Sequence, residues 1–127
     1  MELSKDQTDS VSLAALAADA GVRLRAGQYD WLASSYGYAL AYDRPIPDAI
    51  QQELQASLDE LGATSLVKSD LPPRTSVAYF KPGESFLFAV ATCELPTDAS
   101  GSVQLELIVT IRDDRTYLCI EGISAQF

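Results

Sequence analysis

Apolar residues recur at the spacing of an α-helix in two segments of the first half of the chain. In segment 11–20 they follow candidate N-cap residues, and Gly21 comes next as a residue that commonly ends helices. Segment 47–61 has the clearer pattern, because Pro47 suits a first helical turn and Gly62 is a typical stop. Its apolar side consists of Ile50, Leu54, Leu58 and Leu61. We therefore expect helices over 11–20 and 47–61.

Between these segments, a run rich in aromatic residues predicts another helix over about 26–42. Gly27 and Gly37 would each weaken it by about 1 kcal/mol relative to alanine. Pro45 limits it, because the residue before a proline avoids the helical conformation. Five rings cannot share one helix face, so we expect one face to pack against a loop, the sheet or another molecule. The rings are those of Tyr29, Trp31, Tyr36, Tyr38 and Tyr42.

The second half of the chain has the pattern of β-strands. Segment 86–95 is apolar almost throughout, which predicts a central strand buried on both faces. Segment 103–111 alternates apolar and polar residues, which predicts a strand buried on one face, and residues 112–115 form a hairpin turn. We expect strands over 65–68, 76–80, 86–95, 103–111 and 116–123. This order predicts a single α+β domain over 1–127, with three N-terminal helices packed on a four- to five-stranded antiparallel sheet formed by the C-terminal half.

Composition and charge then exclude several classes of binding partner. The 127 residues are 47% hydrophobic, enough to bury a core, and 18 acidic against 9 basic side chains give a net charge of −9. Such a charge repels nucleic acid and anionic membranes and attracts a basic partner. The first residues are polar, unlike a secretory signal, and no stretch approaches the roughly 18 apolar residues of a membrane span. We therefore expect a cytoplasmic protein.

Much catalytic chemistry is absent from the sequence. The chain contains no histidine, which removes Ser-His and Cys-His nucleophile pairs, and it has no phosphate-binding glycine motif. Two separated cysteines, Cys93 and Cys119, do not make a structural zinc site. They fit buried thiols of a cytoplasmic protein, with a disulfide between neighbouring strands as the alternative. We expect no catalytic residues, no cofactor and no metal.

One pair of carboxylates could still carry chemistry. If the hairpin pairs regularly about the turn 112–115, Glu106 and Glu121 lie directly opposite each other. Two carboxylates that close would shift each other's pKa and could serve as an acid–base pair or bind a cation. Alternatively, they are two solvated glutamates on an outer face. Opposed like charges also destabilise a sheet slightly, which favours contact with a basic partner.

Protein binding is the function class that these features favour. Tyrosine and tryptophan dominate protein interfaces, and acidic groups steer a basic partner into place. Asp59 and Glu60 are unfavourably placed for helix stability, because negative charge at the C-terminal end of a helix opposes the helix dipole. The candidate contact residues are Trp31, Tyr38, Tyr42, Asp43, Asp59, Glu60, Glu106 and Glu121.

As a whole, this profile resembles the small acidic immunity proteins of bacterial polymorphic-toxin and contact-dependent inhibition systems. The resemblance is carried by the size, the α+β order, the sequence pI of about 4.2 and the acidic and aromatic candidates. It implies a cytoplasmic, non-enzymatic protein that neutralises a basic toxin domain, such as a nuclease, by covering its active or substrate-binding surface. The alternatives are an acidic chaperone of a secreted effector, which would be a homodimer, and a carboxylate enzyme. Monomer and homodimer both stay open.

Overall fold

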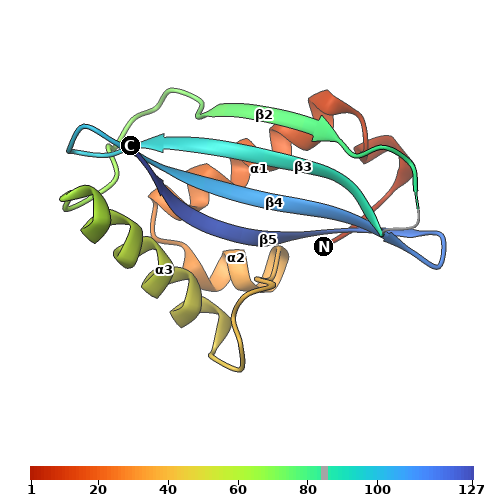
Figure 1. Ribbon diagram of the computed structural model, residues 1–127, viewed down its shortest axis with the longest axis horizontal. Coiled ribbons are helices and arrows are strands. Elements are labelled where there is room, and N and C mark those ends of the chain that lie inside the picture. The colour runs from red at the N-terminus through yellow and green to blue at the C-terminus, as the bar shows by residue number, and fades with distance from the viewer. Residues whose placement is uncertain (84–85) are drawn as a thin grey trace.

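The protein is an α+β structure in which three helices pack against a five-stranded antiparallel sheet (Figure 1). The computed structural model describes residues 1–83 and 86–127. Strand order in the sheet is β1-β5-β4-β3-β2, so the predicted fold class is confirmed. The elements are β1 (Glu2–Leu3), a 3-10 turn η1 (Lys5–Gln7), α1 (Ser10–Arg25), α2 (Tyr29–Ser35), α3 (Ile46–Leu61), β2 (Arg74–Tyr79), β3 (Leu87–Pro96), β4 (Ser102–Arg112) and β5 (Arg115–Gln126).

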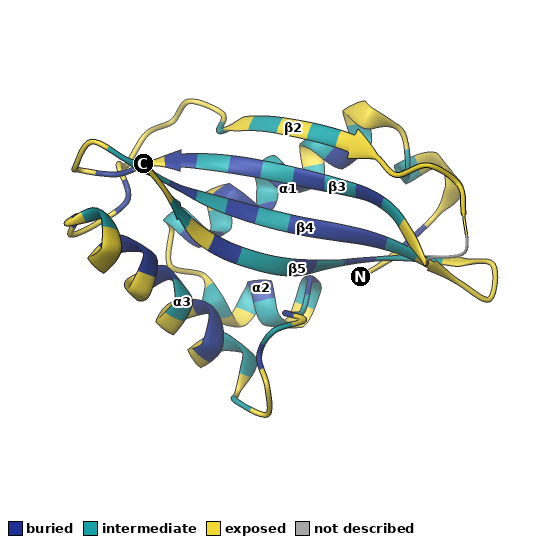
Figure 2. Ribbon diagram, viewed as in Figure 1, coloured by how far each residue is buried: buried dark blue, intermediate teal, exposed yellow. Residues whose placement is uncertain are grey.

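The helices cover one face of the sheet, and the core lies between them and that face (Figure 2). Burial alternates along β3 and along β4 as far as Leu107, so these strands send every second side chain into the core. The prediction that 86–95 is buried on both faces is therefore wrong. Among the helices that the structure describes, none packs over the even-numbered residues from Val90 to Glu94, and these residues are only half-buried. The strand is apolar because its neighbours on the open face shield one another, as Val90 and Ile108 do.

Helix α1 continues past Gly21 to Arg25, so the predicted stop at residue 20 is wrong. Gly21 is needed there for packing, because a Cβ at this position would overlap the Sγ of Cys93 on β3. The helix ends instead just before Gly27, whose φ of 73° lies in the left-handed region.

The predicted aromatic helix over 26–42 is also wrong, because only α2 (Tyr29–Ser35) is helical. Gly37, with φ of 72°, breaks the helix, and Tyr38 then forms an isolated parallel bridge with Ile120 of β5. The Ala39 N–H donates to the Ile120 carbonyl at 2.9 Å. The glycine therefore ends the helix, and the backbone groups that follow it hydrogen-bond to β5, a strand far away in the sequence.

The other boundaries agree closely with the pattern. Helix α3 matches the predicted 47–61 and ends at Gly62, whose φ is 66°. Asp113 and Asp114 both have positive φ, which is the geometry of a tight hairpin turn between β4 and β5. Segment 65–68 contributes only a bridge between Leu66 and Thr97, so the strand predicted there is wrong. Strand β1 was not predicted, since two residues carry no periodic signal.

The two cysteines are both free and lie on different strands separated by β4. Cys93 faces α1 on the covered side, whereas Cys119 pairs with Ile108 on the open side. The alternative of a disulfide between neighbouring strands is therefore wrong. Among the described helices, none combines the length and the apolar character needed to cross a membrane.

Candidate protein-binding surface

The exposed side of α3 carries acidic charge without any basic residue. Every third or fourth residue faces the sheet, including the fully buried Ile50, and the remaining positions face solvent. The charged residues of this helix are Asp48, Glu53, Asp59 and Glu60. Glutamines fill the positions between them, and Gln55 donates to Asp59 at 2.9 Å. No cation lies in the last turn of the helix, so nothing within α3 compensates the carboxylates that oppose its dipole.

Arg44 fastens the loop between α2 and α3 to this helix. Its Nε donates to the Ala41 carbonyl at 2.7 Å, and its Nη2 donates to the Leu40 carbonyl at 2.9 Å. Its Nη1 donates to Gln52 of α3 at 3.0 Å, and Glu53 lies 3.4 Å from Nη2. The charge of Arg44 is therefore used within the fold, and the surface around it stays acidic.

The fastened loop presents Tyr42 and Asp43 to solvent. Both have positive φ, of 52° and 65°, and the Tyr42 side chain is 75% exposed. Backbone strain of this kind persists only where surrounding contacts hold it, and here Arg44 supplies them. We call the exposed side of α3 and this loop tip the acidic helix surface. It consists of Tyr42, Asp43, Asp48, Gln51, Gln52, Gln55, Asp59 and Glu60.

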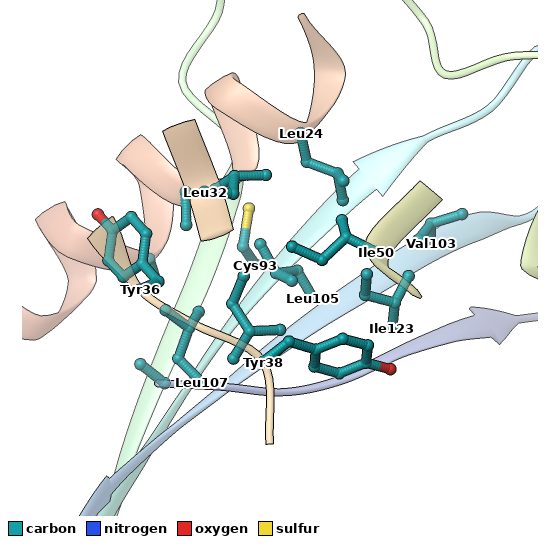
Figure 3. Close-up of a cluster of buried hydrophobic side chains, with 14 of the residues drawn as sticks. Leu24, Leu32, Tyr36, Tyr38, Ile50, Cys93, Val103, Leu105, Leu107 and Ile123 are labelled. Carbon is teal, nitrogen blue, oxygen red and sulfur yellow. The ribbon is translucent and has the colours of Figure 1, made fainter. Parts of the chain in front are cut away.

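Tyr38 does not belong to this surface, so its prediction as a contact residue is wrong. Its ring is 7% exposed and lies in the core beside Ile50 and Ile123, with the hydroxyl at the margin (Figure 3). The pKa of Tyr38 is raised to about 12, mainly by burial; the nearby carboxylates of Glu53 and Glu121 contribute to the rise and Arg44 opposes it.

This burial predicts a loss of stability at alkaline pH. The unfolded chain releases the Tyr38 proton near its ordinary pKa of 10, but the folded protein keeps it until about 12. The free energy of unfolding is therefore expected to fall between these two pH values. Urea unfolding at about pH 9 and about pH 11 measures the fall, which Tyr38→Phe should reduce. Tyr42→Phe, at an exposed ring, should behave like the wild type, and an equal loss in Tyr38→Phe would contradict the assignment.

Trp31 is half-buried and serves the contact between α1 and α2. The guanidinium carbon of Arg23 lies 4.0 Å from its ring centroid, and the ring of Tyr36 lies 5.7 Å away. Tyr36 itself is buried, and its hydroxyl donates to Asp19 at 2.9 Å. These contacts account for Trp31 as an internal packing residue that lies away from the acidic helix surface.

Glu106 and Glu121 are not opposed, so the predicted pair is wrong. Pairing about the turn is regular as far as Leu107 and Ile120, where a bulge inserts Glu121 and shifts Glu106 opposite Gly122. Glu106 lies on the open face of the sheet. Glu121 lies in the bulge of β5, where its charge raises the pKa of the Tyr38 hydroxyl and also that of the Cys119 thiol.

Of two hollows of the molecule, one lies away from the acidic helix surface and the other borders it at Gln51 and Gln55. One of about 370 Å³ is bounded by the end of α1, the loop before β2 and the end of β3. A second, of about 290 Å³, lies between α1 and α3 beside Arg25 and Lys68. Neither is lined by a predicted contact residue. Within 1–83 and 86–127, no three acidic or cysteine side chains gather as a metal site would require.

No protein-family model, curated protein sequence or solved structure matches this chain. The structure places Tyr42 and Asp43 just before the start of α3 and Asp59 and Glu60 at its far end, and it separates Trp31, Tyr38 and Glu106 from both pairs. Sequence reasoning missed the role of Arg44 and did not count Asp48 as a contact. The absence of any lysine or arginine in 46–61 was the available signal.

Proposed function

We propose that the protein is a cytoplasmic immunity protein of a bacterial toxin system. It binds a basic toxin domain through the acidic helix surface and covers the active or substrate-binding surface of that toxin. It acts by binding alone, without a metal or cofactor, and takes no part in nucleic-acid or membrane binding. The steering charge is the same one that opposes contact with nucleic acid or anionic lipid.

The observation that carries this proposal is the composition of the acidic helix surface. Carboxylates follow one another along α3, which has no lysine or arginine of its own. Glu53 is paired with Arg44, and an exposed tyrosine precedes the helix. Long-range attraction to a basic partner needs the first feature, and a buried anchor in the complex needs the second. Arg44 holds Tyr42 in place before binding, which lowers the entropy lost on association.

Charge reversal at the end of α3 tests the proposal. After affinity purification from the native host, the captured toxin is mixed with wild type and with the double variant Asp59→Lys, Glu60→Lys. We expect association at low salt to slow by roughly tenfold, because reversal removes the steering field. Stopped-flow fluorescence or surface plasmon resonance measures the rate, and a toxin-activity assay checks that binding inhibits.

The chain offers a matched control. Asp113→Lys with Asp114→Lys makes the same change in net charge at the β4–β5 hairpin tip, at the opposite end of the molecule from α3 (Figure 1). This variant should associate at close to the wild-type rate at moderate salt. Equal slowing of both variants would show that only net charge matters. Capture of an unfolded segment, with no inhibition of a folded toxin, would contradict the proposal and favour a chaperone.

A further inference from the structure

A hollow of about 290 Å³ lies between the end of α1, α3 and the loop after α3, next to the acidic helix surface. Its floor is apolar and consists of Leu24, Leu54, Leu58 and Leu66. None of these leucines is more than 8% exposed, so the floor is a fixed part of the core. Ligand sites in proteins commonly have such an apolar floor, with a few polar groups placed around it.

Backbone hydrogen bonds hold both sides of this hollow in place. In the loop after α3, the N–H groups of Thr64 and Ser65 donate to the Asp98 carboxylate at 2.8 Å and 3.3 Å. On the other side, the turn between α1 and α2 is closed by the Gln28 N–H, which donates to the Arg23 carbonyl at 2.9 Å. The hollow is therefore formed before a ligand arrives, which lowers the entropy lost on binding.

The rim of the hollow carries two cations, Arg25 in the last turn of α1 and Lys68 in the loop after α3, which we call the rim cations. None of the described residues that line the hollow is acidic. Within the described part of the chain, neither rim cation forms an ion pair, and the one hydrogen bond of Arg25 goes to the Leu71 carbonyl at 3.4 Å. Most of their donors are therefore available to a ligand. Two cations without a carboxylate are unexpected in a chain of 18 acidic and 9 basic side chains.

Carboxylates do occur in the surroundings of the hollow, at Asp30, Asp59, Asp70, Glu94 and Asp98. Asp98 already accepts from the loop after α3, and Asp59 accepts from Gln55 at 2.9 Å. Asp70 shares an adjoining hollow with both rim cations, and one carboxylate leaves a net positive charge between them. Since none of these carboxylates lines the hollow, their repulsion acts over longer distances and is screened by solvent, whereas the rim cations would touch the ligand. The balance favours an anion of one charge and disfavours one of higher charge.

We propose that the hollow binds a small monocarboxylic acid, with its carboxylate on the rim cations and its apolar part on the leucine floor. A guanidinium group matches the two oxygens of a carboxylate, and the lysine ammonium adds a second positive charge. A phosphate group fits less well, because the carbonyls at the C-terminal end of α1 oppose a doubly charged anion. The rim cations repel an amine. This site goes beyond the toxin contact, and its test needs no toxin.

The size of the hollow limits this ligand. Ligand pockets commonly measure about 300–1,000 Å³, so a hollow of about 290 Å³ takes a compound with one ring or one short branched chain. A longer compound would extend over Gln51 and Gln55 onto the acidic helix surface, whose carboxylates repel a second acidic group. Because few ligand atoms are buried, we expect a dissociation constant on the order of 0.1–1 mM.

Phenylacetate is the probe for this site, and amide NMR spectra of the isotope-labelled protein locate where it binds. We expect saturable shifts confined to residues 24–29, 51–58 and 64–68, which surround the hollow. Phenylacetamide has the same shape without the charge and should bind roughly tenfold more weakly. Phenethylamine should not bind in the hollow, and acetate, which has no ring for the leucine floor, should bind too weakly to saturate. Phenyl phosphate should bind more weakly than phenylacetate.

Lys68→Gln tests the role of the rim cations. In the part of the chain that the structure describes, this exposed side chain makes no hydrogen bond or ion pair, so the variant should fold normally. Its affinity for phenylacetate should fall by roughly fivefold, because one charged contact is lost. Lys81→Gln removes the same charge from an exposed lysine after β2 and should bind like the wild type. Adding Arg25→Gln to Lys68→Gln should remove the preference for phenylacetate over phenylacetamide.

Four results would overturn the proposal. The first is the absence of saturable shifts around the hollow at about 10 mM phenylacetate, well above the expected dissociation constant. The second is equal binding of phenylacetate and phenylacetamide to the wild type, and the third is tighter binding of phenyl phosphate. The fourth is an equal loss of affinity in Lys68→Gln and Lys81→Gln, which would show that net charge alone attracts the probe.

Discussion

Replacing Gly21 with alanine is expected to lower the free energy of unfolding by about 2–3 kcal/mol. The added Cβ would overlap the Sγ of Cys93, while Leu95 at 3.4 Å and Pro73 at 3.5 Å would be in ordinary van der Waals contact with it. Cys93 has a single side-chain torsion and is fully buried, so the sulfur has no free space to enter. Either α1 moves away from β3 or the sulfur leaves its rotamer, and both cost packing energy. Urea denaturation measures the loss.

Substitution of Cys93, alone and together with Gly21, provides the control for this prediction. Cys93→Ala alone should destabilise moderately by leaving a small cavity, whereas the double variant Gly21→Ala, Cys93→Ala should recover most of the loss. Burial raises the pKa of the Cys93 thiol to about 12, so the wild-type sulfur should resist alkylation at neutral pH, and labelling would report a displaced α1. Additive losses in the double variant would show that Gly21 and Cys93 do not compete for the same space.

Replacing Arg44 with alanine is expected to cost about 2 kcal/mol of stability. The guanidinium donates to two loop carbonyls and to Gln52, and it pairs with Glu53. Its removal leaves the Leu40 and Ala41 carbonyls without this donor and frees the loop that carries Tyr42. If the proposed function holds, toxin binding should weaken as well, because the loop must then be ordered on association.

The matched control for this variant is Arg74→Ala. Arg74 is 84% exposed and lies 3.9 Å from Glu94, so its loss should change the free energy of unfolding by less than about 0.5 kcal/mol. Chemical denaturation of both variants, with hydrogen exchange across 38–44, separates loop release from general weakening. An Arg44→Ala protein as stable as Arg74→Ala would show that the loop holds its conformation without the guanidinium.

Comparison of α1 with α3 shows where sequence patterns suffice. Helix α3 was predicted almost to the residue because its apolar stripe, its proline and its terminal glycine all act within a few turns. The stop predicted at Gly21 failed because the same residue type serves two purposes. Only contact with Cys93, far away in the chain, decides that Gly21 packs a helix instead of ending it.

The candidate site also contains residues whose positions follow from local sequence and residues whose positions depend on distant contacts. Asp59 and Glu60 were predictable as surface residues from helix periodicity alone. Tyr42 was named as a contact on a helix over 26–42 that does not extend that far, and it is exposed on a loop instead. Tyr38 was misplaced because its position depends on a bridge to Ile120, and a bridge has no local signal. Glu121 was misplaced because one bulge shifts the register of everything beyond it.

Local pattern was enough for the α+β class, the order of the elements, the hairpin turn and the acidic side of α3, since each depends on residues close in sequence. Tertiary structure decided which aromatic rings are buried, how the two glutamates stand and where α1 and α3 enclose a hollow. These properties come from contacts between distant segments, whose energies exceed the propensities of one or two glycines. For this chain, long-range pairing around β5 removed Tyr38 from the surface and left Tyr42 on it.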